Sequence, residues 1–321
     1  MATCPMCGSP IRENSETCAV CGFSFSKGPM LVLPVGTRLR KRFTVGKKLG
    51  QGGFGITYKG TDLQLKRVVA IKEFFLEGSN RQGTTVTAPG TITPVDYQNF
   101  RKRFVEEGQI LASLSHPNIL QVHDFVEENN TNYLITEYVE GENLKHLLNR
   151  RKKLREGEVI GIMQPILDGL VLVHEKNFLH RDIKPENIMI DANGKPVLID
   201  FGSARQFVAG KTGDMTRILT EGYAAPEQYT SKAHFGPELD IYAVGATMYH
   251  LLSGEAPPSA SRRLFGKAEI QDIPGVSESV MRLIRKSLEI QAKERIQGAR
   301  GLLEEWKNPK GKKPLSSNPE M

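Results

Sequence analysis

Two short segments in the middle of the chain carry side chains that could transfer a phosphoryl group. The first, residues 179–187, reads Leu-His-Arg-Asp-Ile-Lys-Pro-Glu-Asn and supplies Asp182, Lys184 and Asn187. The second begins at Asp200, thirteen residues after Asn187. An apolar run, an Asn-Gly turn and a second apolar run fill the interval and predict a hairpin that brings Asn187 and Asp200 together. Their oxygens suit Mg²⁺, which binds few protein ligands and retains phosphate oxygens and water.

A glycine-rich stretch lies upstream and could hold the phosphates of a nucleotide. Strand-like residues flank it on both sides, and no helix follows directly, as a dinucleotide-binding fold would require. Glycine lets backbone N–H groups approach phosphate oxygens because no Cβ stands in the way. Taken alone, the pattern also fits an ordinary hairpin. The stretch follows G-x-G-x-x-G and consists of Gly50, Gln51, Gly52, Gly53, Phe54 and Gly55.

Lys72 ends a β-branched apolar run, which predicts a strand with one charge at its end. By itself it could be a solvated lysine, but after a glycine loop it could clamp the α- and β-phosphates if a helix supplies a carboxylate. Helical spacing places Glu107 on the same face as Phe104 and Leu111 in a helix predicted over 100–114. Glu107 is therefore the predicted partner of Lys72.

Two features beside this helix raise further expectations. Gly108 lies inside it and costs about 1 kcal/mol relative to alanine, so we hypothesise that the helix is only marginally held in its active position. Residues 77–95 form an insertion rich in Thr and Gly between the predicted strand and the helix. The insertion is interpreted as either a mobile flap or a docking surface.

The motifs, taken in order, resemble those of the eukaryotic-like (Hanks-type) serine/threonine protein kinases. The resemblance covers residues 43–306 and is closest to prokaryotic members. It implies an α+β, bilobal protein-kinase fold, with a β-rich N-lobe over 43–137 and a helical C-lobe over 138–306.

The resemblance also assigns the ATP-binding residues. The glycine loop and Lys72 would hold the phosphates. The adenine pocket would be formed by Ala70, the gatekeeper Thr136, backbone groups of Glu137 and Val139, and Met189. Mg²⁺, or Mn²⁺ in its place, would bind Asn187 and Asp200.

In the family, Asp182 would accept the proton of the substrate hydroxyl, and Lys184 would steady the transferred phosphate. Thr220 would pack on both. Lys184 and Thr220 together are typical of members that phosphorylate serine and threonine. The resemblance further implies that Glu227 pairs with Arg295 and that Asp240 anchors the catalytic loop.

Regulation is predicted on the loop from 202 to 220. Arg181 precedes Asp182, so its guanidinium could meet a phosphate on that loop. Thr212 and Thr216 are the candidate phosphorylation sites. They could equally be ordinary polar loop residues.

The N-terminus carries a second, independent motif. Its two Cys-x-x-Cys-Gly knuckles use all four cysteines, and four thiolates at this spacing can close a tetrahedral zinc site. We predict a zinc ribbon over 1–25, in preference to disulfides or a redox pair, followed by a linker over 26–42. Protein interaction is favoured over nucleic-acid binding for this ribbon, because basic and aromatic residues are not interleaved. The ligands would be Cys4, Cys7, Cys18 and Cys21.

Composition agrees with a two-lobed enzyme and a small appendage. The 321 residues carry a net charge of +7, which is spread over the chain and interpreted as solvated surface. Residues 307–321 are expected to form a disordered basic tail. No apolar run has the length of a membrane span, so we expect a cytoplasmic protein.

Three functions compete. The first is an active serine/threonine protein kinase that transfers the γ-phosphoryl group of ATP to protein substrates and is regulated by activation-loop phosphorylation. The second is a pseudokinase scaffold in which ribbon and kinase fold serve protein binding. The third is a small-molecule kinase. Intact Lys72, Glu107, Asp182, Asn187 and Asp200 favour the first over the second. The Ala-Pro-Glu segment at 225–227 and the helix pattern that begins at Asp240 favour it over the third.

Overall fold

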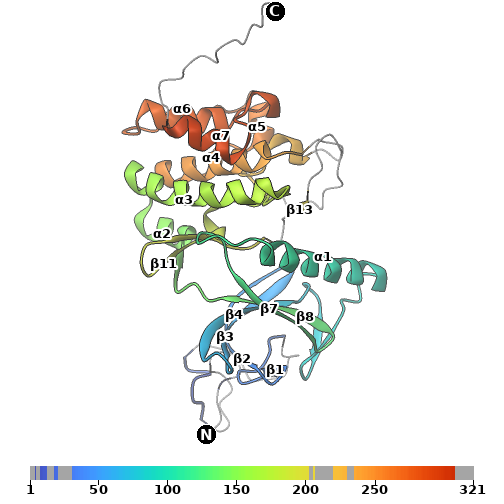
Figure 1. Ribbon diagram of the computed structural model, residues 1–321. Helices are drawn as coiled ribbons and strands as arrows, with labels where there is room; N and C mark the ends of the chain where they lie inside the picture. The colour runs from blue at the N-terminus through green and yellow to red at the C-terminus, as the bar shows by residue number, and fades with distance from the viewer. Residues whose placement is uncertain are drawn as a thin grey trace, which may run out of the picture. The chain divides into compact units, whose positions relative to one another are not determined.

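The chain divides into two compact units. A computed structural model describes residues 4, 8–12, 18–20, 31–201, 205–206, 220–229 and 235–307. The first unit holds the described residues up to Ser115 together with Leu120–Val139. The second holds His116–Ile119 and the described residues from Glu140 onward. Figure 1 shows the helices and strands of both units.

A six-stranded antiparallel sheet forms the first unit, with the strand order β1-β2-β3-β4-β8-β7. Buried and less buried residues alternate along β3 and β4, as expected for strands with one face in the core. The strands predicted on either side of the glycine loop and before Lys72 are therefore present. The strands are β1 (Arg38–Leu39), β2 (Phe43–Gly52), β3 (Gly55–Asp62), β4 (Arg67–Phe74), β7 (Val122–Glu128) and β8 (Thr131–Glu137).

One long helix, α1 (Pro94–Ala112), packs on β7 and β8 of this sheet (Figure 1). It begins six residues before the predicted start at 100. Thr93 caps it by accepting a hydrogen bond from the N–H of Asp96 at 3.1 Å, and Pro94 takes the first helical position. These start signals were present in the sequence, so the last residues assigned to the insertion belong to the helix.

The rest of the 77–95 insertion contains a β-hairpin of β5 (Asn80–Gln82) and β6 (Thr85–Thr87). Val86 attaches it to the β7–β8 turn. The N–H of Val86 donates to Asn129 O at 2.9 Å, and Asn130 Nδ2 donates to Val86 O at 2.9 Å. In the segment expected to be a linker, Val32 and Leu33 are buried in the same core cluster as Val86. Both segments therefore help to cover the sheet.

Helices dominate the second unit, and α4 (Glu238–Ser253) lies at its centre. Every residue of α4 from Leu239 to Leu252 is buried, because α3, α6 and α7 pack around it (Figure 1). The other helices are α2 (Leu144–Arg151), α3 (Glu156–Glu175), α5 (Ala260–Leu264), α6 (Glu278–Ser287) and α7 (Gly298–Lys307). Three short 3₁₀ turns occur at η1 (Pro185–Asn187), η2 (Pro226–Tyr229) and η3 (Ala292–Glu294).

By length and composition alone, α3 could also cross a membrane. In this unit it is a core helix, since Met163, Ile166, Leu167 and Leu170 are fully buried. This length of apolar helix was not anticipated from the sequence, where no run of membrane-spanning length was expected.

The predicted hairpin between Asn187 and Asp200 is present in the second unit. Strands β11 (Ile188–Asp191) and β12 (Pro196–Leu198) pair antiparallel, and β9 (Gly141–Asn143) joins the other edge of β11. Asp191 Oδ1 accepts from the N–H groups of Asn193 and Lys195, and Gly194 has a φ of +82°. A further short pair joins β10 (Phe178–Leu179) to β13 (Arg205–Gln206). A β-rich unit and a helical unit thus give the predicted kinase fold class.

Candidate active site

The predicted ion pair between β4 and α1 is present in the first unit. Lys72 Nζ lies 2.7 Å from Glu107 Oε1, and the Glu107 side chain is nearly buried. Ala70 shares the face of β4 that carries Lys72, because side chains two residues apart point the same way. Across the strand pairs, Thr57 lies opposite Lys72, and Thr136 lies opposite Ala70. Lys72, Ala70 and Thr136 therefore occupy one face of the sheet.

Gly108 has a packing reason that the sequence did not reveal. A Cβ at this buried position would lie 2.9 Å from Leu134 Cδ1 of β8. Glycine thus lets α1 approach the sheet closely, next to the residue that pairs with Lys72. The hypothesis that α1 is only marginally held stays a prediction.

The glycine-rich stretch is a hairpin between β2 and β3, with Gly52 paired to Gly55. Its tip is held by the chain that follows β4. The N–H of Glu77 donates to Gly53 O at 2.9 Å, and the N–H of Phe75 donates to Phe54 O at 3.1 Å. The Phe54 ring also lies 5.8 Å from the ring of Phe100 on α1.

At the end of β8, Thr136 and Glu137, both predicted adenine-pocket residues, are held by hydrogen bonds within the first unit. Thr136 is buried, and its Oγ1 donates to Glu137 O at 3.1 Å. Gln121 holds Glu137 from the other side by accepting from its N–H at 2.9 Å. The first unit ends at Val139. Met189 belongs to the second unit, where it pairs with Asn143 on β9.

Asp182 is the centre of a compact polar cluster in the second unit. Lys184 Nζ lies 2.7 Å from Asp182 Oδ2 and donates to Thr220 Oγ1 at 3.1 Å. Thr220 Oγ1 in turn donates to Asp182 Oδ1 at 2.9 Å. Asn187 Nδ2 donates to Asp182 O at 2.7 Å and to Asp182 Oδ2 at 3.0 Å. The structure therefore brings together four of the predicted residues around one carboxylate.

The geometry of Asn187 fits a role as a metal ligand. Its amide nitrogen is committed to Asp182, so the amide oxygen is the atom that it could offer to a cation. Hairpin pairing places Asp200 nearby, because the N–H of Ile199 donates to Asn187 O at 2.9 Å. Asp200 has a φ of +59°, and the next residue, Phe201, is fully buried. Two hard oxygen donors at this spacing suit Mg²⁺.

Asp240 anchors the backbone of the predicted catalytic loop. Its Oδ2 accepts from the N–H of His180 at 2.9 Å, and its Oδ1 accepts from the N–H of Arg181 at 2.7 Å. His174 Nε2 lies 3.0 Å from the same carboxylate. Burial alone would raise the pKa of Asp240, but the hydrogen bond to His174 and the other nearby partners lower it overall. The anchor is therefore a charged group, and it holds the backbone directly before Asp182.

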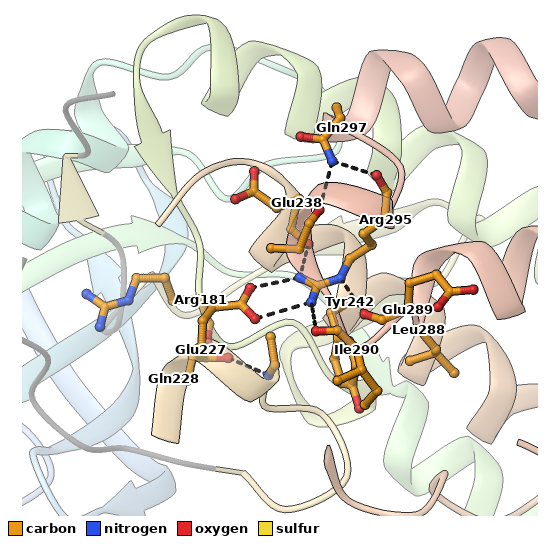
Figure 2. A network of polar contacts seen from close by, with 12 residues as sticks. Arg181, Glu227, Gln228, Glu238, Tyr242, Leu288, Glu289, Ile290, Arg295 and Gln297 are labelled. Atoms are coloured by element: carbon orange, nitrogen blue, oxygen red, sulfur yellow. Dashed lines mark hydrogen bonds and ion pairs between the residues drawn. The ribbon is translucent and has the colours of Figure 1, made fainter. Parts of the chain in front are cut away.

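The predicted pair between Glu227 and Arg295 is also present (Figure 2). Arg295 Nη1 lies 2.8 Å from Glu227 Oε1, and Nη2 lies 3.2 Å from Oε2, which is the two-pronged geometry of strong arginine–carboxylate pairs. The same guanidinium donates to the carbonyl oxygens of Glu289, Glu238 and Ile290. It thereby ties η2 to the start of α4 and to the chain after α6.

The predicted regulatory and zinc-binding residues lie partly outside the described residues. Four of them are outside: Thr212, Thr216, Cys7 and Cys21. Arg181 is described, and its backbone N–H donates to Asp240. Cys4 and Cys18 are buried. Gly8 has a φ of +75°, and its N–H donates to the backbone oxygen of Cys4 at 2.8 Å. The assignment of the four cysteines as zinc ligands stays a prediction.

Sequence reasoning missed a buried polar network on the opposite face of β4. Glu73, next to Lys72, pairs with Arg81 of the insertion at 2.6 Å, and Tyr58 Oη donates to Glu73 at 2.9 Å. The alternation of β4 could have indicated that Glu73 points into the core. Arg81 lies in a polar insertion, where nothing in the sequence indicated that its side chain is buried.

Comparison with known families agrees with this geometry. Residues 43–306 match the model of the protein kinase domain, and residues 1–27 match that of the GTF2H2 zinc ribbon domain. The first match covers most of the chain, so the chain belongs to the protein kinase family.

Bacterial serine/threonine kinases are among its relatives. The chain is 33% identical over 232 residues to serine/threonine-protein kinase PrkC of Bacillus subtilis, covering 70% of this chain and 32% of PrkC. It is 28% identical over 320 residues to serine/threonine-protein kinase B of Synechocystis, covering 95% of this chain and 51% of that protein. The chain thus spans about a third to about half the length of these relatives. Among solved structures, the PpkA-294 apo form has a TM-score of 0.77 at 30% identity, covering 86% of this chain and 99% of that one.

Proposed function

We propose that the protein is an active serine/threonine protein kinase that transfers the γ-phosphoryl group of ATP to protein hydroxyls. The observation that carries this proposal is the cluster around Asp182. An Asn187 amide and a Lys184 ammonium hold the carboxylate in one orientation beside the Thr220 hydroxyl. A scaffold protein would have no need for such a constellation.

The chemistry assigned to these side chains is a single displacement. The substrate hydroxyl oxygen forms a bond to the γ-phosphorus, and the bond from that phosphorus to the bridging oxygen of ADP breaks. Asp182 accepts the hydroxyl proton, while Lys184 faces the transferred phosphoryl group. In the first unit, Lys72 is held by Glu107 to clamp the α- and β-phosphates. Mg²⁺ bound to Asn187 and Asp200 would neutralise charge that develops on the phosphate oxygens.

Substrate class and regulation follow from the same residues. Lys184 and Thr220 contact each other and Asp182, which supports serine and threonine as acceptors. We infer that phosphate on Thr212 or Thr216 would meet Arg181 and order the activation loop through charge-assisted hydrogen bonds.

For the N-terminal segment we propose a structural zinc ion bound by the four cysteines and a protein partner, rather than nucleic acid. Two knuckles of some twenty residues bury too little surface to fold alone, so metal binding would supply the folding energy. A cytoplasmic location, where thiols stay reduced, is part of the same proposal.

A radiolabel assay tests the proposed activity directly. ATP labelled at the γ-phosphate is incubated with Mg²⁺, the 321-residue chain, and one basic and one acidic protein substrate, and the labelled residues are identified after acid hydrolysis. The proposal expects label on serine or threonine, and none with Asp200→Asn. Label on a small-molecule acceptor alone, or no transfer by the wild type, would reject it.

A further inference from the structure

The face of β4 opposite Lys72 carries a buried ion pair that the proposed reaction does not use. The side chains of Glu73 and Arg81 have no exposed surface, and Arg81 Nη2 lies 2.6 Å from Glu73 Oε2. Burial of two charges is unfavourable unless they are paired and their remaining hydrogen-bonding atoms have partners. Replacement of a buried ion pair by apolar residues of similar volume often leaves a fold equally stable. A buried pair therefore indicates that the segments it joins must be placed precisely.

This pair joins several segments of the first unit. Tyr58 Oη on β3 donates to Glu73 and accepts from the N–H of Leu33 at 3.0 Å. Arg81 Nε donates to Leu31 O at 3.2 Å, and its Nη1 donates to Thr84 O at 2.9 Å in the hairpin turn. We use the name latch for the side chains of Tyr58, Glu73 and Arg81.

The latch closes a loop of chain that holds the glycine-rich hairpin. Phe75 and Glu77 lie between Glu73 and Arg81, and their N–H groups donate to Phe54 O and Gly53 O. The ion pair fixes both ends of the segment that supplies these two hydrogen bonds. Displacement of the segment would therefore move the tip of the hairpin.

The other face of β4 connects the latch to α1. Phe74 follows Glu73 and packs against the rings of Tyr97 and Phe104, at 5.5 and 5.7 Å between centroids. Lys72 precedes Glu73 and pairs with Glu107. Lys72 and Phe74 thus contact α1, while Glu73 between them belongs to the latch. A shift of the strand at Glu73 therefore moves Lys72.

We propose that Arg81 is a positioning residue that acts through Glu73 to place both the glycine-rich hairpin and Lys72 for binding ATP. This inference rests on the proposed phosphoryl transfer and gives the 77–95 insertion a function. Leu31 and Leu33 supply backbone contacts to the latch.

Removal of the Arg81 charge has a defined consequence. Burial raises the pKa of Glu73, and Arg81 opposes that rise. Without the guanidinium, the carboxylate must take up a proton or admit water, and either change releases the segment between residues 73 and 81. A displacement of about 1 Å in a phosphate-binding group weakens catalysis by up to about a hundredfold.

The test compares the wild-type 321-residue chain with Arg81→Met and Arg81→Lys. Steady-state kinetics give KM for ATP and kcat, and calorimetry gives Kd for Mg·ADP. We expect Arg81→Met to raise KM and Kd by about tenfold or more, with partial recovery in Arg81→Lys. A purely structural role would lower the folded fraction, and hence the apparent kcat, without changing KM or Kd.

Arg42→Met is the matched control. Arg42 pairs at 2.7 Å with Asp62, whose side chain is also fully buried, but it makes no contact with the latch among the described residues. It should leave KM and Kd unchanged. Tyr58→Phe keeps the ion pair and removes one hydroxyl, so it serves if Arg81→Met does not fold, and it should raise Kd by a smaller factor.

The two levels of the proposal fail in different ways. Wild-type protein that transfers no phosphoryl group would reject the proposed function, and the Kd comparison would still decide the role of Arg81. Values of Kd for Arg81→Met or Tyr58→Phe within about twofold of wild type would overturn the inference. An equal rise in Arg42→Met would do the same.

Discussion

Replacement of Arg295 by methionine is expected to destabilise the second unit strongly. The side chain is fully buried, faces the Glu227 carboxylate and donates to three backbone carbonyl groups (Figure 2). Methionine retains much of the apolar volume but removes the cation that faces the Glu227 carboxylate and the donor that the three carbonyl groups share.

The magnitude follows from these contacts. Removal of one partner of a buried ion pair costs about 3–5 kcal/mol. Because 11% of the Glu227 side chain is exposed, its loss of a partner favours the lower end of this range, whereas the loss of three hydrogen bonds to carbonyl groups favours the upper end. We therefore expect a loss of about 4 kcal/mol in the free energy of unfolding. For a unit of this size, each kcal/mol corresponds to about 2–4 °C, so Tm should fall by about 8–16 °C.

Urea denaturation and calorimetry of wild type, Arg295→Met and Lys286→Met provide the assay. Lys286 forms an ion pair of the same length, 2.8 Å, with Glu305 in the same unit, but it is 47% exposed. Exposed pairs contribute about 1 kcal/mol or less, so the control should lose no more than about 4 °C. Equal losses in the two variants would refute the reasoning that burial makes Arg295 important.

Three further predictions concern the nucleotide clamp, pH and metal. Glu107→Gln should raise KM for ATP by about tenfold, because Lys72 loses its ionic partner; an unchanged KM would show that the pair is not needed. Burial lowers the pKa of His180 below its unfolded value near 6.5, so the unfolded chain binds protons more readily, and stability present above that pH is lost as pH falls below it. Calorimetry between pH 8 and pH 5.5 should show a falling Tm, and a constant or rising Tm would contradict this. Elemental analysis should find about one zinc ion per chain, and Cys4→Ser with Cys18→Ser should abolish binding; full zinc content in the double variant would exclude the ribbon site.

The site residues that could be predicted from the sequence are those whose positions follow from short-range spacing along the chain. The hairpin from Asn187 to Asp200 was predictable because an Asn-Gly turn separates two apolar runs. The Lys72–Glu107 pair was predictable because helical periodicity left one carboxylate on an apolar face. Motif order added Asp240 and the Glu227–Arg295 pair, whose partners are too distant for spacing alone.

The remaining features depend on tertiary contacts between residues that look ordinary in sequence. Arg81 stands in a polar insertion typical of a surface loop, and only the fold shows that its charge is buried against Glu73. Gly108 appears unfavourable by helix propensity, but the close approach of Leu134 favours it. The start of α1 is different, since Thr93 and Pro94 carried a recognisable capping signal that was overlooked.

The most direct test of the central claim compares phosphoryl transfer by wild type and Asp182→Asn at saturating Mg·ATP, with Kd for Mg·ADP measured alongside. Loss of the proton acceptor should slow transfer by about 10² to 10⁴-fold while Kd stays unchanged. A variant that transfers phosphate at the wild-type rate would contradict the assignment of Asp182 as the group that accepts the hydroxyl proton.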